Sequence, residues 1–206
     1  MKKRIIIKTQ EMLNKYFKDS SLRMEKNTVI SFRHNLKLGS NIFFKGKINL
    51  GQDNEIESNC ILSNINFGNN NHIRMSSLIN DSKIENNIII GPFAFIRNKT
   101  KIEKYCIIAA YVEVTRSTIQ EKTYISHRAF IGDVKIGREV IIGAGVVFCN
   151  YNFKTNSKKK TIVGNYVKVG ANSTIIAPIK IKNNTVIPAL TKLKKDSILF
   201  IKQKNL

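Results

Sequence analysis

The residues with the clearest capacity for chemistry lie between Ile125 and Tyr151. His127 supplies an imidazole, which titrates near neutral pH and is therefore a natural side chain to accept a proton. After it come a corner of small residues, 143–145 (Gly-Ala-Gly), and the pair Asn150-Tyr151, which opens the one long polar insertion of the chain. This combination predicts a site in which a base stands close to a tight backbone turn.

A repeat that runs through most of the chain must position these residues. Aliphatic or aromatic residues recur at steps of six, joined mostly by steps of five, from about Phe32 to Leu193. An amphipathic helix or a half-buried strand has a different period, whereas a β-helix of hexapeptide repeats has this one, because each short strand buries its apolar face by stacking on the next coil. We therefore predict an all-β parallel β-helix. The small residue that often follows the aliphatic, commonly glycine, is expected to let the backbone turn a corner. Two of the sets are Ile84, Ile90, Ile96, Ile102, Ile108 and Val114, and Ile136, Ile142 and Phe148.

The repeat also divides the chain. Residues 1–25 lack it, and the run Glu11–Phe17 is expected to form a short amphipathic helix that caps the open end of the solenoid. Residues 26–206 form the predicted repeat domain, interrupted at 149–161 by a lysine-rich excursion, and such a loop on a rigid scaffold commonly carries function. Beyond the repeat, Ile198–Ile201 are expected to close the other end.

The chain is strongly basic, with 35 Lys and Arg against 14 Asp and Glu and a net charge of +21. A nucleic-acid or anionic-surface binder has such a charge, but so does a protein from an AT-rich genome, in which Lys, Asn and Ile are all abundant. The second interpretation is favoured because the lysines are spread along the chain and no nucleic-acid motif accompanies them. We expect no nucleic-acid partner.

Other classes are disfavoured by what the sequence lacks. No apolar run is long enough to span a bilayer, and Ile5–Ile7 is too short for the core of a signal peptide. A cytoplasmic location without a membrane partner is therefore expected. The three cysteines have no metal-ligand spacing and no metal site is predicted; a zinc carbonic anhydrase needs three converging histidines, and His34 and His72 lie far along the solenoid from His127.

From about Met12 onward, the chain resembles the C-terminal acetyltransferase half of the bacterial bifunctional N-acetylglucosamine-1-phosphate uridyltransferase/glucosamine-1-phosphate acetyltransferase. The most specific feature is Gly-Ala-Gly, then Cys-Asn-Tyr and, after a short loop, Lys-Thr-Ile, within 143–162. The left-handed sense of the β-helix comes from this resemblance. No Gly-rich nucleotide-binding start is present, which leaves room for a separate uridyltransferase as a partner. The other resembling stretches are 90–97 (IGPFAFIR), 111–114 (YVEV), 125–137 (ISHRAFIGDVKIG), 160–178 and 187–191 (IPALT).

The resemblance implies transfer of an acetyl group from acetyl-CoA to the amine of glucosamine 1-phosphate. The product, N-acetylglucosamine 1-phosphate, serves the synthesis of UDP-N-acetylglucosamine and of peptidoglycan and lipopolysaccharide precursors. It also implies a homotrimer, with active sites in the grooves between neighbouring subunits and the 149–161 loop reaching towards a partner. Acetyl-CoA is a co-substrate, and no permanently bound cofactor is implied.

The same resemblance assigns roles to individual residues. His127 matches the base and Glu113 the carboxylate that orients it, and the backbone amide of Ala144 matches the group that stabilises the oxyanion of acyl transfer. Arg97 matches a ligand of the sugar phosphate, and Ala171 and Ala189, with Ala144, lie along the acetyl-CoA. The further matching substrate contacts, to the sugar and to acetyl-CoA across the subunit interface, are Asn150, Tyr151 and Lys158.

Several positions depart from the family. Thr115 stands where the family has a lysine for the sugar phosphate, and Arg116 is a candidate substitute, although a shift of one residue in a strand reverses the face. Each lost hydrogen bond costs roughly 1 kcal/mol, so we expect an intact base and oxyanion site beside weakened acceptor binding. The remaining departures are Phe130 for a tyrosine, Ile141 for an asparagine, Ala171 for a serine, Pro188 and Leu190 at a small-residue corner, and Lys202 or Lys204 in place of an arginine for the CoA phosphate.

Two other functions stay open. One is another hexapeptide N-acyltransferase, against which the Gly-Ala-Gly, Cys-Asn-Tyr, Lys-Thr-Ile signature argues. The other is a degenerate, non-catalytic trimeric scaffold for a separate uridyltransferase, against which the retention of His127, Glu113 and Arg97 argues.

Overall fold

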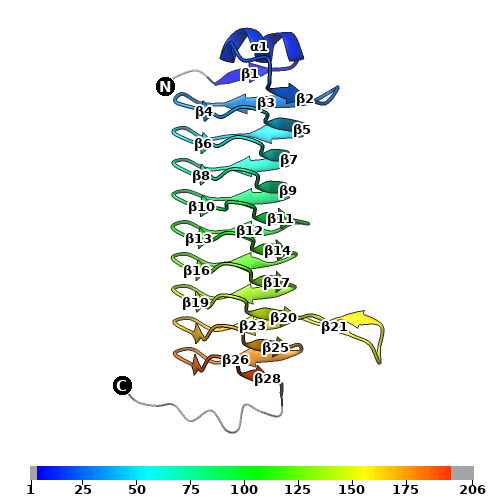
Figure 1. Cartoon of the computed structure of the whole chain (residues 1–206), viewed down its shortest axis with the longest axis vertical. Coiled ribbons are helices and arrows are strands. Elements are labelled where there is room, and N and C mark those ends of the chain that lie inside the picture. The colour runs from blue at the N-terminus through cyan, green and yellow to red at the C-terminus, as the bar shows by residue number, and fades with distance from the viewer. Residues whose placement is uncertain (1–3, 196–206) are drawn as a thin grey trace.

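The computed structural model describes residues 4–195. They form a tall parallel β-solenoid with one short helix at its N-terminal end (Figure 1). Each coil contributes short strands that pair in parallel with the coils above and below: Ile108 of β13 (Ile107–Ile108), for example, pairs with Ile90 and Ile125. The predicted all-β β-helix is therefore confirmed.

The strands give the solenoid three walls. One wall is a nine-stranded sheet from β4 to β27, and the other two share a 17-stranded sheet because the long strands β5, β7 and β9 contribute to both. The strands are β1 (Ile5–Ile7), β2 (Arg23–Met24), β3 (Val29–Phe32), β4 (Lys37–Leu38), β5 (Phe43–Asn49), β6 (Glu55–Ile56), β7 (Ile61–Phe67), β8 (His72–Ile73), β9 (Leu78–Ile84), β10 (Ile89–Ile90), β11 (Phe95–Arg97), β12 (Lys101–Ile102), β13 (Ile107–Ile108), β14 (Glu113–Thr115), β15 (Thr118–Ile119), β16 (Tyr124–Ile125), β17 (Phe130–Gly132), β18 (Val134–Ile136), β19 (Ile141–Ile142), β20 (Val147–Cys149), β21 (Tyr151–Asn152), β22 (Ser157–Lys158), β23 (Thr161–Val163), β24 (Lys168–Val169), β25 (Thr174–Ile176), β26 (Ile179–Ile181), β27 (Val186–Ile187) and β28 (Lys192–Leu193).

The repeated aliphatic residues form the core. Ile136, Ile142 and Phe148, which lie in the successive strands β18, β19 and β20, are buried, and each stacks on its counterpart one coil away. Burying such a side chain fully contributes about 1.5–3 kcal/mol. The six-residue repeat of the sequence thus reflects an apolar core that recurs in every coil.

The glycines serve a different purpose from the predicted one. Only three of the eleven have a positive φ, and the left-handed corners are filled mainly by other residues, asparagine most often, as at Asn70. Asparagine tolerates that conformation better than most residues. A Cβ added at Gly51 would instead lie 2.3 Å from the carbonyl oxygen of Gly68 in the next coil. Glycine is needed there because the coils approach closely, which corrects the explanation by corner turning.

The N-terminal segment covers the first coil, as predicted. Thr9 caps helix α1 (Gln10–Phe17) by accepting a hydrogen bond from the Met12 amide, and Leu13 of this helix is buried. Before it, β1 pairs antiparallel with β3, so the open edge of the solenoid is paired as well as covered. An exposed β edge invites pairing with another chain, and this cap removes it.

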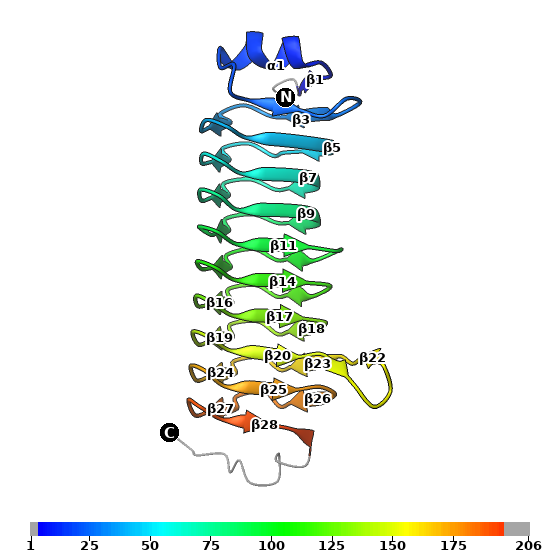
Figure 2. The ribbon, with the colours of Figure 1, turned by 45° about the vertical axis from the view of Figure 1, so that its right-hand side comes forward.

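The regular stacking is interrupted once, between β20 and β23. There β21 and β22 pair antiparallel, as a hairpin that projects from the side of the solenoid (Figures 1 and 2). Residues 4–195 contain no helix long and apolar enough to cross a membrane. The predicted end closure at Ile198–Ile201, and the CoA-phosphate candidates Lys202 and Lys204, lie outside the described residues.

Candidate active site

The solenoid places His127 in one corner column with the three alanines assigned to acetyl-CoA. Backbone hydrogen bonds between successive coils align these four residues. In each bond, the amide of the residue that follows one of the alanines donates to the backbone carbonyl of the aligned residue one coil earlier. They run from Gly145 to His127 (2.9 Å), from Asn172 to Ala144 (2.8 Å) and from Leu190 to Ala171 (2.9 Å).

The column exposes the groups that acyl transfer needs. His127 is exposed, and Ala144, one coil on, is half-buried. Within residues 4–195 the backbone N–H of Ala144 donates to no protein acceptor, since the neighbouring coil bonds involve Gly143 and Gly145 instead. This donor is fixed by the coils on either side and free for a ligand oxygen, and such a preorganised donor is effective because it need not reorganise during reaction.

The imidazole of His127 has a local partner in Ser126, whose Oγ lies 3.3 Å from Nδ1. Over the described part of the chain it makes no other side-chain hydrogen bond. Glu113, predicted to orient the imidazole, binds Arg97 instead: its Oε1 accepts from Arg97 Nε at 3.0 Å and from Nη2 at 2.6 Å. The orienting role of Glu113 stays a prediction.

Arg97 is held on the outer face of the wall formed by β11, β14 and β17. Its strand neighbour Phe95 pairs with Glu113, and Glu113 pairs with Phe130 one coil on. The guanidinium lies over the Phe95 ring, 5.0 Å from its centre. Because Arg97 and Glu113 are each about one-third exposed (33% and 32%), the pair stabilises the fold little, by less than about 1 kcal/mol. The pair holds the Arg97 guanidinium in a partly exposed position.

The next corner holds a network that the sequence interpretation missed. Arg116 donates from Nε and Nη2 to the two carboxylate oxygens of Asp133, at 2.8 and 2.9 Å, and Asn150 Nδ2 donates to Oδ2 at 2.5 Å. The three residues are spaced by 17, which is one coil, and this spacing was the signal available in the sequence. Asp133 is 9% exposed in its side chain, and it is the most enclosed carboxylate among the described ion pairs.

The charge state of this network follows from its bonds. Burial alone would raise the pKa of Asp133, but the hydrogen bonds from Arg116 and Asn150, with the charges of Arg116 and Lys158, outweigh it and hold that pKa below its ordinary value. The hydrogen bond to Asp133 raises the pKa of Arg116. The pair is therefore ionised at neutral pH.

Arg116, the candidate substitute for the lysine missing at Thr115, is bound within its own chain. Its Nη1 donates to Thr115 Oγ1 at 2.9 Å, so each of its three guanidinium nitrogens has a partner within the chain. Thr115 itself is fully buried and also accepts from Asn98. Three of the five guanidinium N–H groups of Arg116 are used by these bonds within residues 4–195, and its role as a substitute ligand stays a prediction.

The other predicted acceptor ligands lie on the hairpin. Tyr151 of β21 pairs with Lys158 of β22, both are exposed, and the Tyr151 ring meets the edge of Phe153 at the turn. Phe153 is 84% exposed. The structure therefore brings Asn150, Tyr151 and Lys158 together on one element, separated from the His127 column by the wall that carries Glu113 and Phe130.

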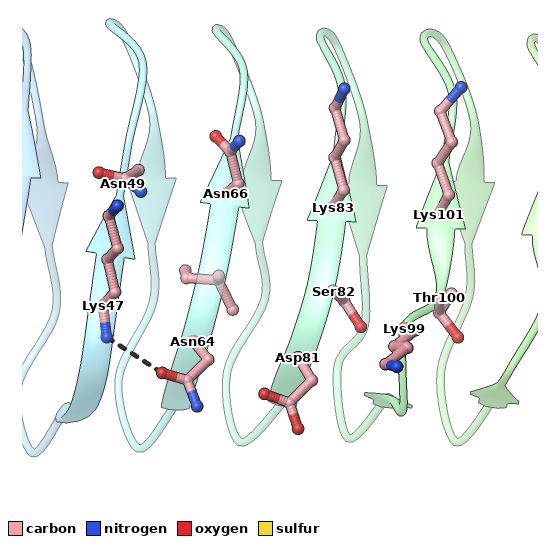
Figure 3. A pocket seen from close by; sticks show the side chains of 11 residues that line it. Lys47, Asn49, Asn64, Asn66, Asp81, Ser82, Lys83, Lys99, Thr100 and Lys101 are labelled. Atoms are coloured by element: carbon pink, nitrogen blue, oxygen red, sulfur yellow. Dashed lines mark hydrogen bonds between the residues drawn. The ribbon is translucent and has the colours of Figure 1, made fainter.

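Other polar features lie away from this column. A shallow groove crosses β5, β7, β9 and β12 and gathers lysines, among them Lys47, Lys83 and Lys101, with Asp81 (Figure 3). It holds no histidine or cysteine. His72, expected to be structural, lies with Nε2 2.6 Å from Glu57 Oε1.

Comparison with known proteins agrees with the repeat. A family described as "Bacterial transferase hexapeptide (six repeats)" matches residues 81–116. The chain is 38% identical over 165 residues to the "Bifunctional protein GlmU" of Baumannia cicadellinicola, covering 77% of this chain and 35% of that protein. It is 39% identical over 180 residues to that of Ruthia magnifica, covering 86% of this chain and 39% of that protein.

Among solved structures, the UDP-N-acetylglucosamine O-acyltransferase (LpxA) of Moraxella catarrhalis has a similar fold, with a TM-score of 0.53 at 17% identity over 76% of this chain and 63% of that chain. The chain spans well under half the length of the curated relatives that it matches. Hexapeptide repeats in a parallel β-solenoid and identity above 35% to two GlmU proteins lead to one conclusion: this chain is a left-handed β-helix of hexapeptide repeats that is similar to a part of the GlmU proteins.

Proposed function

We propose that the protein transfers an acetyl group from acetyl-CoA to the amine of glucosamine 1-phosphate. The observation that carries this proposal is the corner column, in which His127 stands one coil before the free amide of Ala144 and in line with Ala171 and Ala189. The similarity to GlmU proteins supports the choice of acceptor.

The reaction needs a proton acceptor, because the amine attacks in its neutral form, after its ammonium proton has passed to solvent, and its nitrogen must lose a further proton once it bonds to the thioester carbon. His127 takes that proton as the nitrogen bonds to the thioester carbon. The carbonyl electrons move to oxygen, where the N–H of Ala144 donates to the oxyanion. Collapse re-forms the carbonyl, the carbon–sulfur bond breaks, and the sulfur of CoA leaves as a thiol once it takes the proton from His127.

The acceptor is bound from two sides in this proposal. Arg97, held in place by Glu113, presents remaining guanidinium N–H groups for the phosphate, as its planar fork of donors suits. Asn150, Tyr151 and Lys158 supply contacts from the hairpin. Because Thr115 is buried and carries no charge, we propose weaker acceptor binding than in the family pattern.

A homotrimer is part of the proposal. The outer face of β13, β16 and β19 exposes three large apolar residues in register, Ile107, Tyr124 and Ile141. Phe153, at the tip of the projecting hairpin, is exposed and packs into no core among residues 4–195. A second copy would cover both features and would bring the hairpin to a neighbouring His127 column.

The test is thiol release from acetyl-CoA with glucosamine 1-phosphate as acceptor. His127→Ala is expected to lower the rate by 10²–10⁴-fold, a typical contribution of general-base catalysis, while His72→Ala serves as the matched control and keeps the rate. Equal rates in the two variants would remove His127 from the mechanism. If longer acyl-CoAs or other amino sugars react faster, the protein is another hexapeptide N-acyltransferase. No release from folded, trimeric protein would favour a scaffold for a separate uridyltransferase.

A further inference from the structure

The hairpin that carries the acceptor ligands is tied to the solenoid at a single residue of the preceding coil. Asp133 accepts from Asn150 Nδ2 through its side chain, at 2.5 Å, and from the Thr161 amide through its backbone carbonyl, at 3.1 Å. Asn150 immediately precedes β21 and Thr161 begins β23, so Asp133 holds both ends of the excursion. A third bond, from the Lys159 amide to the Asn150 carbonyl at 2.7 Å, closes the neck.

Arg116 keeps Asp133 in place. The carboxylate receives two donors from the guanidinium, and a two-point contact between planar groups restricts rotation of both. The backbone leaves room for this arrangement only because residue 132 is glycine: a Cβ at Gly132 would lie 2.6 Å from Asn150 Nδ2. The chain thus builds a clamp of Arg116, Asp133 and Asn150 at the foot of the hairpin.

The clamp also decides which atom of Asn150 is available. An ionised carboxylate only accepts hydrogen bonds, so it turns the amide NH₂ of Asn150 towards itself. The carbonyl Oδ1 then faces away from Asp133 and can accept from a ligand. That side of the site therefore suits a hydrogen-bond donor, such as a sugar hydroxyl or an ammonium group, and disfavours a phosphate or carboxylate.

We propose that Asp133, held by Arg116, is a positioning residue. It orients Asn150 and the hairpin so that the enzyme binds a hydrogen-bond-donating group of its acceptor substrate there. This inference rests on the proposed function for its kinetic part. It assigns no contact between Asp133 and the substrate, and the effect passes through Asn150.

Asp133→Asn tests the clamp, with Asp81→Asn as the matched control. Both aspartates occupy left-handed corners, at φ 57° and 43°, and asparagine tolerates that conformation; Asp81 carries no side-chain bond to the hairpin. Asp133→Asn is expected to raise KM for glucosamine 1-phosphate about tenfold, the effect of one lost hydrogen bond to a charged group. The KM for acetyl-CoA and kcat at saturating acceptor stay unchanged.

Amide hydrogen exchange of the 150–161 segment supplies a readout that does not need activity. In Asp133→Asn this segment should exchange several-fold faster, with the core strands unaffected, and Asp81→Asn should match the unaltered protein. Unchanged exchange in Asp133→Asn overturns the clamp. Faster exchange with an unchanged acceptor KM overturns the positioning role. If the unaltered protein transfers no acetyl group, the proposed function fails. The inference about Asp133 is then decided by direct binding of glucosamine 1-phosphate, which should be weaker in Asp133→Asn than in the unaltered protein.

Discussion

The close approach of successive coils can be tested at Gly51. A methyl group there would lie 2.3 Å from Gly68 O, and reaching 3.4 Å, where contacts are ordinary, requires a separation of 3.4 − 2.3 = 1.1 Å. The Gly51 amide bonds to the next coil, to Phe67 O at 3.0 Å and Gly68 O at 3.1 Å. A shift of this size breaks both contacts. Overpacking costs about 1–3 kcal/mol and a lost hydrogen bond about 1 kcal/mol, so Gly51→Ala should lose roughly 2–4 kcal/mol.

The control is Gly46→Asn, in the strand before. Gly46 has a φ of +68°, which asparagine accepts, and the three atoms nearest to its built Cβ all belong to the flexible side chain of Asn64. We expect this change to cost under about 1 kcal/mol. Thermal unfolding followed by circular dichroism, at one protein concentration, measures the difference: at roughly 2–4 °C per kcal/mol, Gly51→Ala should melt roughly 4–16 °C lower than the unaltered protein. Equal melting temperatures for the two variants would refute the argument from coil spacing.

Three further outcomes are expected. Burial raises the pKa of the Cys60 thiol to about 11 and that of Cys106 to about 12, so iodoacetamide at pH 8 should label the half-buried Cys149 first, as peptide mass spectrometry would show; prior labelling of Cys60 would contradict it. Phe153→Ser should leave the monomer fold intact but shift the assembly to smaller species in sedimentation velocity, and an unchanged assembly would exclude the hairpin tip from the interface. The pKa of Asp133 is lowered on folding, so its ion pair stabilises the fold above the ordinary carboxyl range and this contribution is lost as pH falls through the lowered value. The gap in urea midpoint between the unaltered protein and Asp133→Asn should hold from pH 7 to about 5 and shrink below about 4.

Much of the architecture follows from local pattern, because the same environment recurs in each coil. The six-residue period selects inward positions such as Ile142, and the lack of that period in residues 1–25 places the cap. One assumption failed for a physical reason. Glycine was attributed to corner turning, although residues such as Asn70 make the turns and Gly51 makes room for the next coil. Asparagine also has a structural use that the sequence interpretation did not include, because many asparagines occupy left-handed corners.

The site was harder to predict because its contacts join residues one coil apart. The coil length of about 17 residues aligns Arg116, Asp133 and Asn150, yet a search by hexads does not look at that spacing. Even with the alignment known, the partner of Arg97 is decided by side-chain geometry: Glu113 lies on the adjacent strand, within reach, and binds it.

A solenoid can add a functional element only where the addition leaves its stacking intact, and this chain shows how. Val147 pairs with Thr174, a step of 174 − 147 = 27 residues, whereas Phe130 pairs with Val147 at a step of 147 − 130 = 17. The ten extra residues leave and return at a corner, so Phe148 still pairs with Ile175 as if nothing had been inserted. The packing of the core therefore does not depend on the hairpin. The hairpin itself is exposed and short, and it needs an anchor of its own. Asp133 supplies that anchor from the preceding coil, so under the proposed positioning role its ion pair with Arg116 contributes to the chemistry as well as to the fold.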